Sequence, residues 1–67
     1  MYSFRVEKKE EIINKYKLSY IAGEVGISLT YLSNILNNKT DCKKVVAYCI
    51  TKIVDNTKEV DYFFTKK

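Results

Sequence analysis

The residues of this 67-residue chain best suited to recognition chemistry are uncharged hydrogen-bonding side chains gathered in one short segment. They are Ser28, Thr30, Ser33 and Asn34, with Asn37 following. On a helix of about 3.6 residues per turn, these side chains project from the side opposite the apolar residues Leu32 and Ile35. A carboxamide such as that of Asn34 can pair bidentately with adenine in the major groove of DNA. The pattern is therefore typical of a helix that reads base edges.

A tight helix-turn-helix is the element expected to position this polar face. Ala22 lies four residues before Gly26, and its small side chain leaves room for a second helix to cross close by. Gly26 can adopt the positive φ that ends the first helix in a short turn. Ser28 is the predicted N-cap of the second helix, because its hydroxyl can accept a hydrogen bond from a free N–H of the first turn. The second helix is expected to end near Asn37, because Asn38 tolerates the left-handed conformation that closes a helix.

Residues 16–40 resemble the Cro/CI-type phage repressors, the XRE family of bacterial and phage regulators. The resemblance rests on the runs IAGEVGIS, YLSNIL and NNKT, and more loosely on Val60–Phe64, which looks like the start of the family's fifth helix. It implies an all-α, lambda repressor-like fold, a compact bundle of about five helices containing a helix-turn-helix. It also implies repression through operator binding as a dimer.

The resemblance further implies two sets of DNA contacts. The base-reading set is Ser28, Leu29, Thr30, Ser33 and Asn34. The phosphate-binding set is Lys17, Tyr20, Asn37, Asn38, Lys39, Lys43 and Lys44. The chain departs from the family at Leu18, where relatives commonly carry a phosphate-binding glutamine. The expected phosphate contacts therefore depend more on Lys17 and Lys39. The alternative is that the polar residues form only the solvated face of an amphipathic helix, and that the lysines are merely solvated.

The periodicity predicts one domain over residues 1–67, with five helices and no strand. The expected helices run from Phe4 to Tyr16 with Ser3 as N-cap, from Leu18 to Val25, from Ser28 to Asn37, from Cys42 to Val54, and from about 58 to Thr65. Val45, Val46, Cys49, Ile50 and Ile53 mark the expected buried stripe of the fourth helix. The residues expected to be largely buried are Ile21, Ala22, Val25, Ile27, Leu32, Ile35, Val46, Cys49, Ile50 and Phe63.

Three consecutive aromatic residues, Tyr62, Phe63 and Phe64, stand close to the end of the sequence. One short helix cannot bury all three, and aromatic residues are enriched at protein interfaces. They are therefore the predicted interface of a homodimer. The alternative is that all three pack only into the core of the monomer.

Composition excludes several classes of function. The chain has no histidine, no glycine-rich phosphate loop and no cluster of metal ligands, so an enzyme, a metal site and a cofactor are not expected. Cys42 and Cys49 would lie about 10 Å apart on one helix, too far for a disulfide, so two reduced thiols with Cys49 in the core are expected. No apolar run approaches a membrane span and no secretory signal is visible, so no membrane association and a cytoplasmic location are expected.

The net charge of +4 is unevenly distributed. Residues 18–38 carry one charge, Glu24, whereas lysines dominate both flanks. Basic flanks that hold phosphates beside a neutral reading surface suit double-stranded DNA as the partner. The predicted function is a sequence-specific transcriptional regulator, a phage-, prophage- or plasmid-type repressor that binds a pseudo-palindromic operator as a dimer. The alternative is a protein-interaction module of the same fold, either an antitoxin-like or an anti-repressor subunit.

Overall fold

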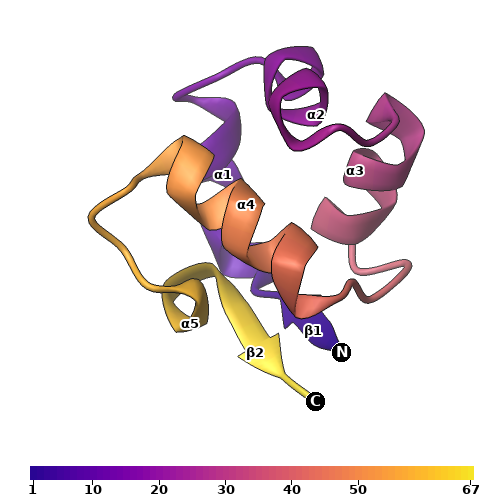
Figure 1. The fold of residues 1–67 in the computed structure, drawn as a ribbon, viewed down its shortest axis with the longest axis vertical. Helices are drawn as coiled ribbons and strands as arrows, with labels where there is room; N and C mark the ends of the chain where they lie inside the picture. Colours follow the sequence, from indigo (N-terminus) through magenta and orange to yellow (C-terminus); the bar gives the residue numbers. More distant parts are fainter.

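A computed structural model describes residues 1–67 as a mostly helical domain with a small two-stranded sheet (Figure 1). The elements in chain order are β1 (Tyr2–Phe4), the 3-10 turn η1 (Val6–Lys8), α1 (Lys9–Ile13), α2 (Leu18–Val25), α3 (Leu29–Leu36), α4 (Lys44–Val54), α5 (Val60–Phe63) and β2 (Phe64–Lys66). Five α-helices are present, as the periodicity predicts, and the bounds of α2 agree with the sequence prediction. The expectation of an all-α chain is wrong.

The two strands join the beginning of the chain to its end. β1 and β2 pair antiparallel, with Phe4 opposite Phe64. Both of these side chains are buried, and their rings meet edge to face with centroids 5.4 Å apart. Ser3 therefore lies in a strand and is not a helix N-cap, and α1 begins only at Lys9. Burial of the two facing phenylalanines favours strand pairing over the continuous first helix that was expected.

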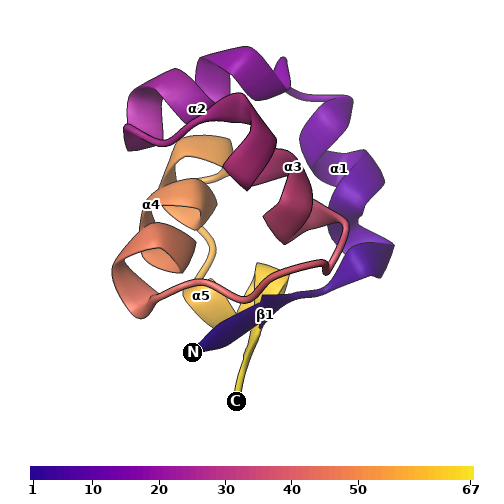
Figure 2. The same cartoon turned by 90° about the vertical axis from the view of Figure 1, so that its right-hand side faces the viewer.

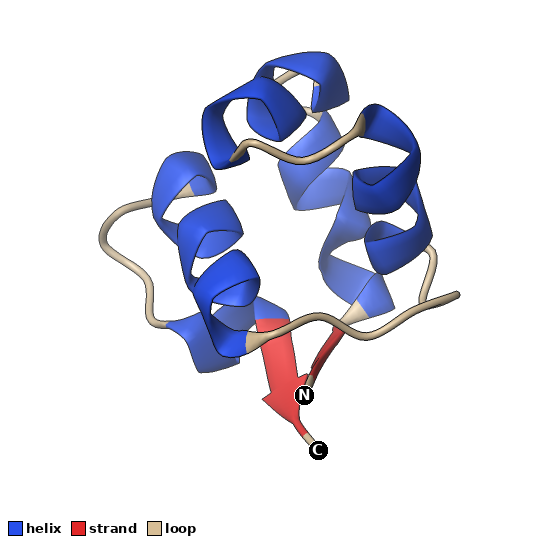
Figure 3. Cartoon of the chain, turned by 45° about the vertical axis from the view of Figure 1, so that its right-hand side comes forward, coloured by secondary structure: helices blue, strands red, loops and turns tan.

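Both termini lie beside the sheet, at the opposite end of the molecule from α2 (Figures 2 and 3). The backbone N–H of Lys67 donates to the carbonyl of Met1 over 2.8 Å, which extends the pairing to the last residue. Tyr2 and Cys42 also exchange two backbone hydrogen bonds, so β1 holds the α3–α4 loop on its other edge. Both α3 and α4 pack against α2, and α3 also packs against β1. The core lies between these elements.

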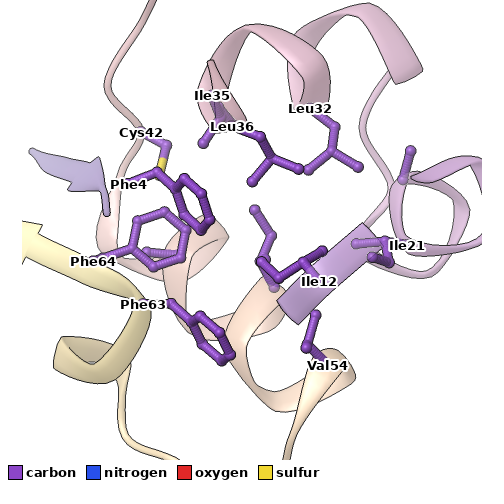
Figure 4. Packing of buried hydrophobic residues seen from close by; sticks show 13 residues of the cluster. Phe4, Ile12, Ile21, Leu32, Ile35, Leu36, Cys42, Val54, Phe63 and Phe64 are labelled. Atoms are coloured by element: carbon purple, nitrogen blue, oxygen red, sulfur yellow. The ribbon is translucent and has the colours of Figure 1, made fainter. Parts of the chain in front are cut away.

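A cluster of thirteen buried hydrophobic residues forms the core (Figure 4). Six of the residues expected to be buried lie in it: Ile21, Ala22, Leu32, Ile35, Ile50 and Phe63. Val25, Ile27 and Val46 are only half-buried and pack against its edge.

The buried stripe of α4 is offset from the predicted one. Ala47, Ile50, Thr51 and Val54 face the core, whereas Val45 is 65% exposed and Cys49 is half-buried. The buried thiol is that of Cys42, so the expectation for the two cysteines is reversed. The cause is that α4 begins at Lys44, after Cys42 has already been placed beside β1 by its backbone bonds to Tyr2.

Candidate nucleic-acid interface

A three-residue connection, residues 26–28, joins α2 to α3. Gly26 adopts the left-handed conformation, with φ 85°, and its N–H donates to the carbonyl of Ala22 over 2.9 Å. The N–H of Ile27 donates to the same carbonyl, so two bonds close the end of α2. Ala22 is 4% exposed where α2 packs against its neighbours. The left-handed conformation predicted for Gly26 and the burial predicted for Ala22 are confirmed.

Ser28 starts α3 as predicted, because its Oγ accepts a hydrogen bond of 3.0 Å from the backbone N–H of Tyr31. The helix buries Leu32, Ile35 and Leu36. Its other side carries no charged residue along its whole length. The fold therefore presents an uncharged polar surface here, which we call the α3 face; its residues are Ser28, Leu29, Thr30, Ser33 and Asn34.

The side chains of the α3 face differ in how freely they can meet a partner. Ser28, Leu29 and Thr30 are exposed, and Leu29 keeps half of its surface open to solvent. Ser33 and Asn34 are half-buried. The carboxamide of Asn34 and the hydroxyl of Thr30 form no hydrogen bond within the chain, so both are free to bind.

The two asparagines that follow α3 are engaged within the protein. The Oδ1 atom of Asn37 accepts a hydrogen bond from the ammonium group of Lys9, and its Nδ2 donates to Ser33 Oγ over 3.3 Å. Asn38 has the left-handed φ of 60° expected of it, and its Oδ1 accepts from Ser3 Oγ over 2.8 Å. Both side chains thus hold the α3–α4 loop against β1 and α1. They are less available to phosphates than the sequence suggested.

Unpaired lysines flank the α3 face. Lys17, Lys39, Lys43 and Lys44 are all exposed, and none forms an ion pair, a side-chain hydrogen bond or a cation–π contact. Of the other lysines, only Lys66 is equally unengaged. The four lysines assigned to phosphates from the sequence are therefore four of the five that no internal partner holds.

The start of α2 adds an aromatic contact. Tyr20 is 51% exposed and stacks on Tyr16, with ring centroids 5.4 Å apart and an interplanar angle of 27°. Lys17 occupies the N-cap position without a side-chain hydrogen bond, so no side chain satisfies the first N–H groups of α2. Leu18, in place of the family's glutamine, is half-buried against the core.

Sequence reasoning missed Lys9. It lies in the expected first helix, and its ammonium group reaches Asn37, 28 residues away, beside the end of α3. No local pattern could reveal this contact, because it depends on how α1 packs beside the α3–α4 loop.

The C-terminal aromatic residues divide into core and surface. Phe63 and Phe64 are 2% and 0% exposed, so their side chains belong to the core of the monomer and cannot cover a second molecule. Tyr62 is half-buried, and its hydroxyl donates to a carboxylate oxygen of Glu11 over 2.8 Å. The alternative of core packing therefore accounts for two of the three.

Two surface hollows lie away from the α3 face. The smaller, of about 310 Å³, is lined by Glu11, Lys15, Val54, Asp55, Lys58, Tyr62 and Phe63. The larger, of about 570 Å³, is lined by Tyr2, Lys44, Tyr48, Glu59, Val60, Asp61 and Lys66, and we call it the α4 groove. Val45 and Tyr48, both exposed, lie on the same helix and leave this side of α4 partly apolar.

The titratable groups with shifted pKa values lie outside the α3 face. Burial, with a smaller effect of Asp41, raises the pKa of the Cys42 thiol to about 11, so the thiol stays protonated at neutral pH. Hydrogen bonds from Thr57 hold the pKa of Asp55 below its usual value. No group of three or more histidine, cysteine, aspartate or glutamate residues is placed to hold a metal ion.

Comparison with protein-family models, with curated proteins and with solved structures found no match. No helix has both the length and the apolar character required to cross a lipid bilayer.

Proposed function

We propose that this protein is a sequence-specific DNA-binding transcriptional regulator of the repressor type. In this proposal α2, the turn at Gly26 and α3 act as a helix-turn-helix, and α3 enters the major groove. The observation that carries the proposal is the uncharged polar α3 face flanked by exposed lysines without internal partners. A surface of this kind suits DNA, because cations bind the phosphates while neutral donors and acceptors read the bases.

The two kinds of contact would have different roles. Asn34 can pair with adenine, and Leu29 can pack on a thymine methyl group. Lys17 at the start of α2 and Lys39 beyond the end of α3 would neutralise phosphates on either side of the groove, as would Lys43. Lys44 instead lines the α4 groove. Each neutralised phosphate releases counterions, so affinity would fall as salt is raised.

A homodimer on a pseudo-palindromic operator completes the proposal. Two α3 helices must lie about 34 Å apart to enter successive major grooves, and joining two half-sites raises a weak affinity to a useful one. Bound in this way, the dimer would exclude polymerase or a rival regulator.

Burial of Phe63 and Phe64 moves the proposed dimer interface to the α4 groove. Lys66, Glu59 and Asp61 all line the groove, and Tyr48 adds an aromatic surface that is 49% exposed. A two-fold axis brings the same patch of each copy together, so Lys66 of one copy can meet Glu59 and Asp61 of the other. This charge pattern fits a second copy of the chain.

Sedimentation of two matched variants tests the interface. Tyr48→Asp places a charge in the α4 groove and should weaken self-association, while Tyr62→Asp places the same charge in α5, at the smaller hollow. Helix content, measured by circular dichroism, should survive in Tyr48→Asp because this side chain is exposed. Equal effects of the two variants, or a wild type that stays monomeric even on DNA, would contradict the proposed interface.

A mobility-shift titration against duplex DNA at two salt concentrations tests DNA binding itself. The double variant Lys39→Ala/Lys43→Ala should bind more weakly than wild type, with a shallower dependence on salt. The double variant Lys15→Ala/Lys58→Ala is the charge-matched control, because both lysines line the smaller hollow. A wild type that binds no duplex at low salt would remove the proposal and favour a protein-interaction module.

A further inference from the structure

Three polar side chains form a chain of hydrogen bonds at the end of α3. The ammonium group of Lys9 donates to Asn37 Oδ1, and Asn37 Nδ2 donates to Ser33 Oγ over 3.3 Å. Lys9 comes from the start of α1, whereas Ser33 and Asn37 lie one helical turn apart. The chain of bonds therefore links a separate part of the fold to one of the polar residues of the α3 face.

The donor of each bond follows from the chemistry of lysine. An ammonium group has three donors and no acceptor, so only the oxygen of the Asn37 amide can face Lys9. This orientation turns the amide NH₂ toward Ser33, and an NH₂ group can only donate. The hydroxyl oxygen of Ser33 is thereby an acceptor in this bond. Ser33 donates to no group within the protein, so its hydroxyl proton is left for a partner outside it.

We infer that Asn37 is a positioning residue that makes Ser33 a hydrogen-bond donor toward DNA, and that the base pair facing Ser33 is chosen for an acceptor. This inference rests on the proposed function. In the major groove guanine offers N7 and O6, adenine offers N7 and thymine offers O4 as acceptors, whereas cytosine offers only its N4 donor. Cytosine is therefore the base that gives the free Ser33 proton no acceptor.

The inference predicts how the preference changes when Asn37 is replaced by aspartate. A carboxylate can accept from both Lys9 and Ser33, but it cannot donate. The Ser33 proton then turns toward residue 37, and the oxygen lone pairs face the DNA. The preference at that one position should change to a base with a donor, the N4 amine of cytosine or the N6 amine of adenine.

Selection of bound duplexes from a random library, repeated for each variant, is the decisive experiment. Wild type should disfavour cytosine at one position by roughly 3- to 10-fold, the range of one hydrogen bond. Ser33→Ala should lose that preference, and Asn37→Asp should change it to a donor base. Asn38→Asp is the matched control, since it adds the same charge one residue away but bonds to Ser3 instead. It should bind more weakly and keep the wild-type preference.

The outcomes separate the inference from the function beneath it. If wild type enriches a sequence but Asn37→Asp keeps the acceptor base at every position, the role of Asn37 is wrong and DNA binding stands. If wild type enriches nothing, both the inference and the proposed function fail. The side-chain amide resonances of Asn37 in the free protein give a check without DNA, because they should shift in Ser33→Ala and stay unchanged if the bond is absent.

Discussion

Replacing Gly26 or Gly23 with alanine should change the stability of the domain in opposite directions. Gly26 has φ 85°, and a Cβ added there would meet no atom within 4 Å. The cost of Gly26→Ala is therefore that of the left-handed backbone alone, roughly 1–2 kcal/mol for an L-residue. About 0.4–1 kcal/mol is regained because alanine restricts the unfolded chain. The net loss of stability should be about 0.5–1 kcal/mol, and Gly26→Val should lose more, because a β-branched residue resists positive φ.

Gly23 provides the control within the same helix. A Cβ there also meets nothing within 4 Å, but the residue lies inside α2 with no positive φ. Gly23→Ala should therefore stabilise the domain by about 0.5–1 kcal/mol, the helix preference for alanine over glycine.

Thermal melts followed by circular dichroism can resolve this difference. In a domain of this size 1 kcal/mol moves Tm by roughly 4–8 °C, so the two alanine variants should differ by several degrees around the wild type. Gly26→Asn should fall between them, since asparagine tolerates the left-handed region. If Gly26→Ala raises Tm as Gly23→Ala does, then Gly26 is not left-handed in solution and the reasoning about the turn fails.

Three further predictions address binding, ionisation and packing. Asn34→Ala should lose about 1–3 kcal/mol of binding free energy on the preferred duplex and relax the sequence preference of the protein. Lys39→Ala should instead weaken binding to all duplexes and lower the salt slope by roughly one unit. Equal losses of affinity across all sequences for both variants would exclude α3 as the reading element. The pKa of about 11 at Cys42 lies above that of an unfolded thiol, so the free energy of unfolding should fall as pH rises from about 9 to 11, by up to about 2–3 kcal/mol. Denaturant titrations should show a shallower fall with pH for Cys42→Ala. Identical pH dependence of the two proteins would contradict burial of the thiol. Phe64→Ala should cost about 3–5 kcal/mol, because the side chain is fully buried against Phe4; a melt within a few degrees of wild type would show that β2 does not contribute to the core.

The parts of the fold that were predictable are those set by neighbouring residues. Gly26, Ser28 and Asn38 each act on the backbone within a few residues, and the bounds of α2 and the conformations at all three agree with the sequence prediction. The strands escaped notice because β1 and β2 are each only three residues long and no turn connects them directly. Their pairing depends on burial of Phe4 against Phe64, which no local periodicity reports.

The candidate site was likewise predictable from the sequence only in part. The neutral character of α3 and the abundance of flanking lysines are visible in the sequence. Which lysines stay unpaired is not, since Lys15 meets Asp55 and Lys67 meets Asp41 only through the fold. The role of Asn37 likewise depends on Lys9, which α1 brings to the end of α3. The phase of α4 was misjudged because its apolar residues do not all lie on one face: Val45 is exposed, whereas the polar Thr51 is buried.

The pairing of β1 with β2 also bears on how the chain assembles during synthesis. The ribosome releases a chain from its N-terminus onward, so β1 emerges early and must wait until residues 64–66 have left the exit tunnel. The α2–α3 pair needs no such delay, because its contacts join residues close in sequence. The loop that carries Asn38 and Lys39 rests on β1, so its final shape depends on the position of β1. In the proposed function, a nascent chain would therefore form its reading helix before it completes the support for its phosphate contacts.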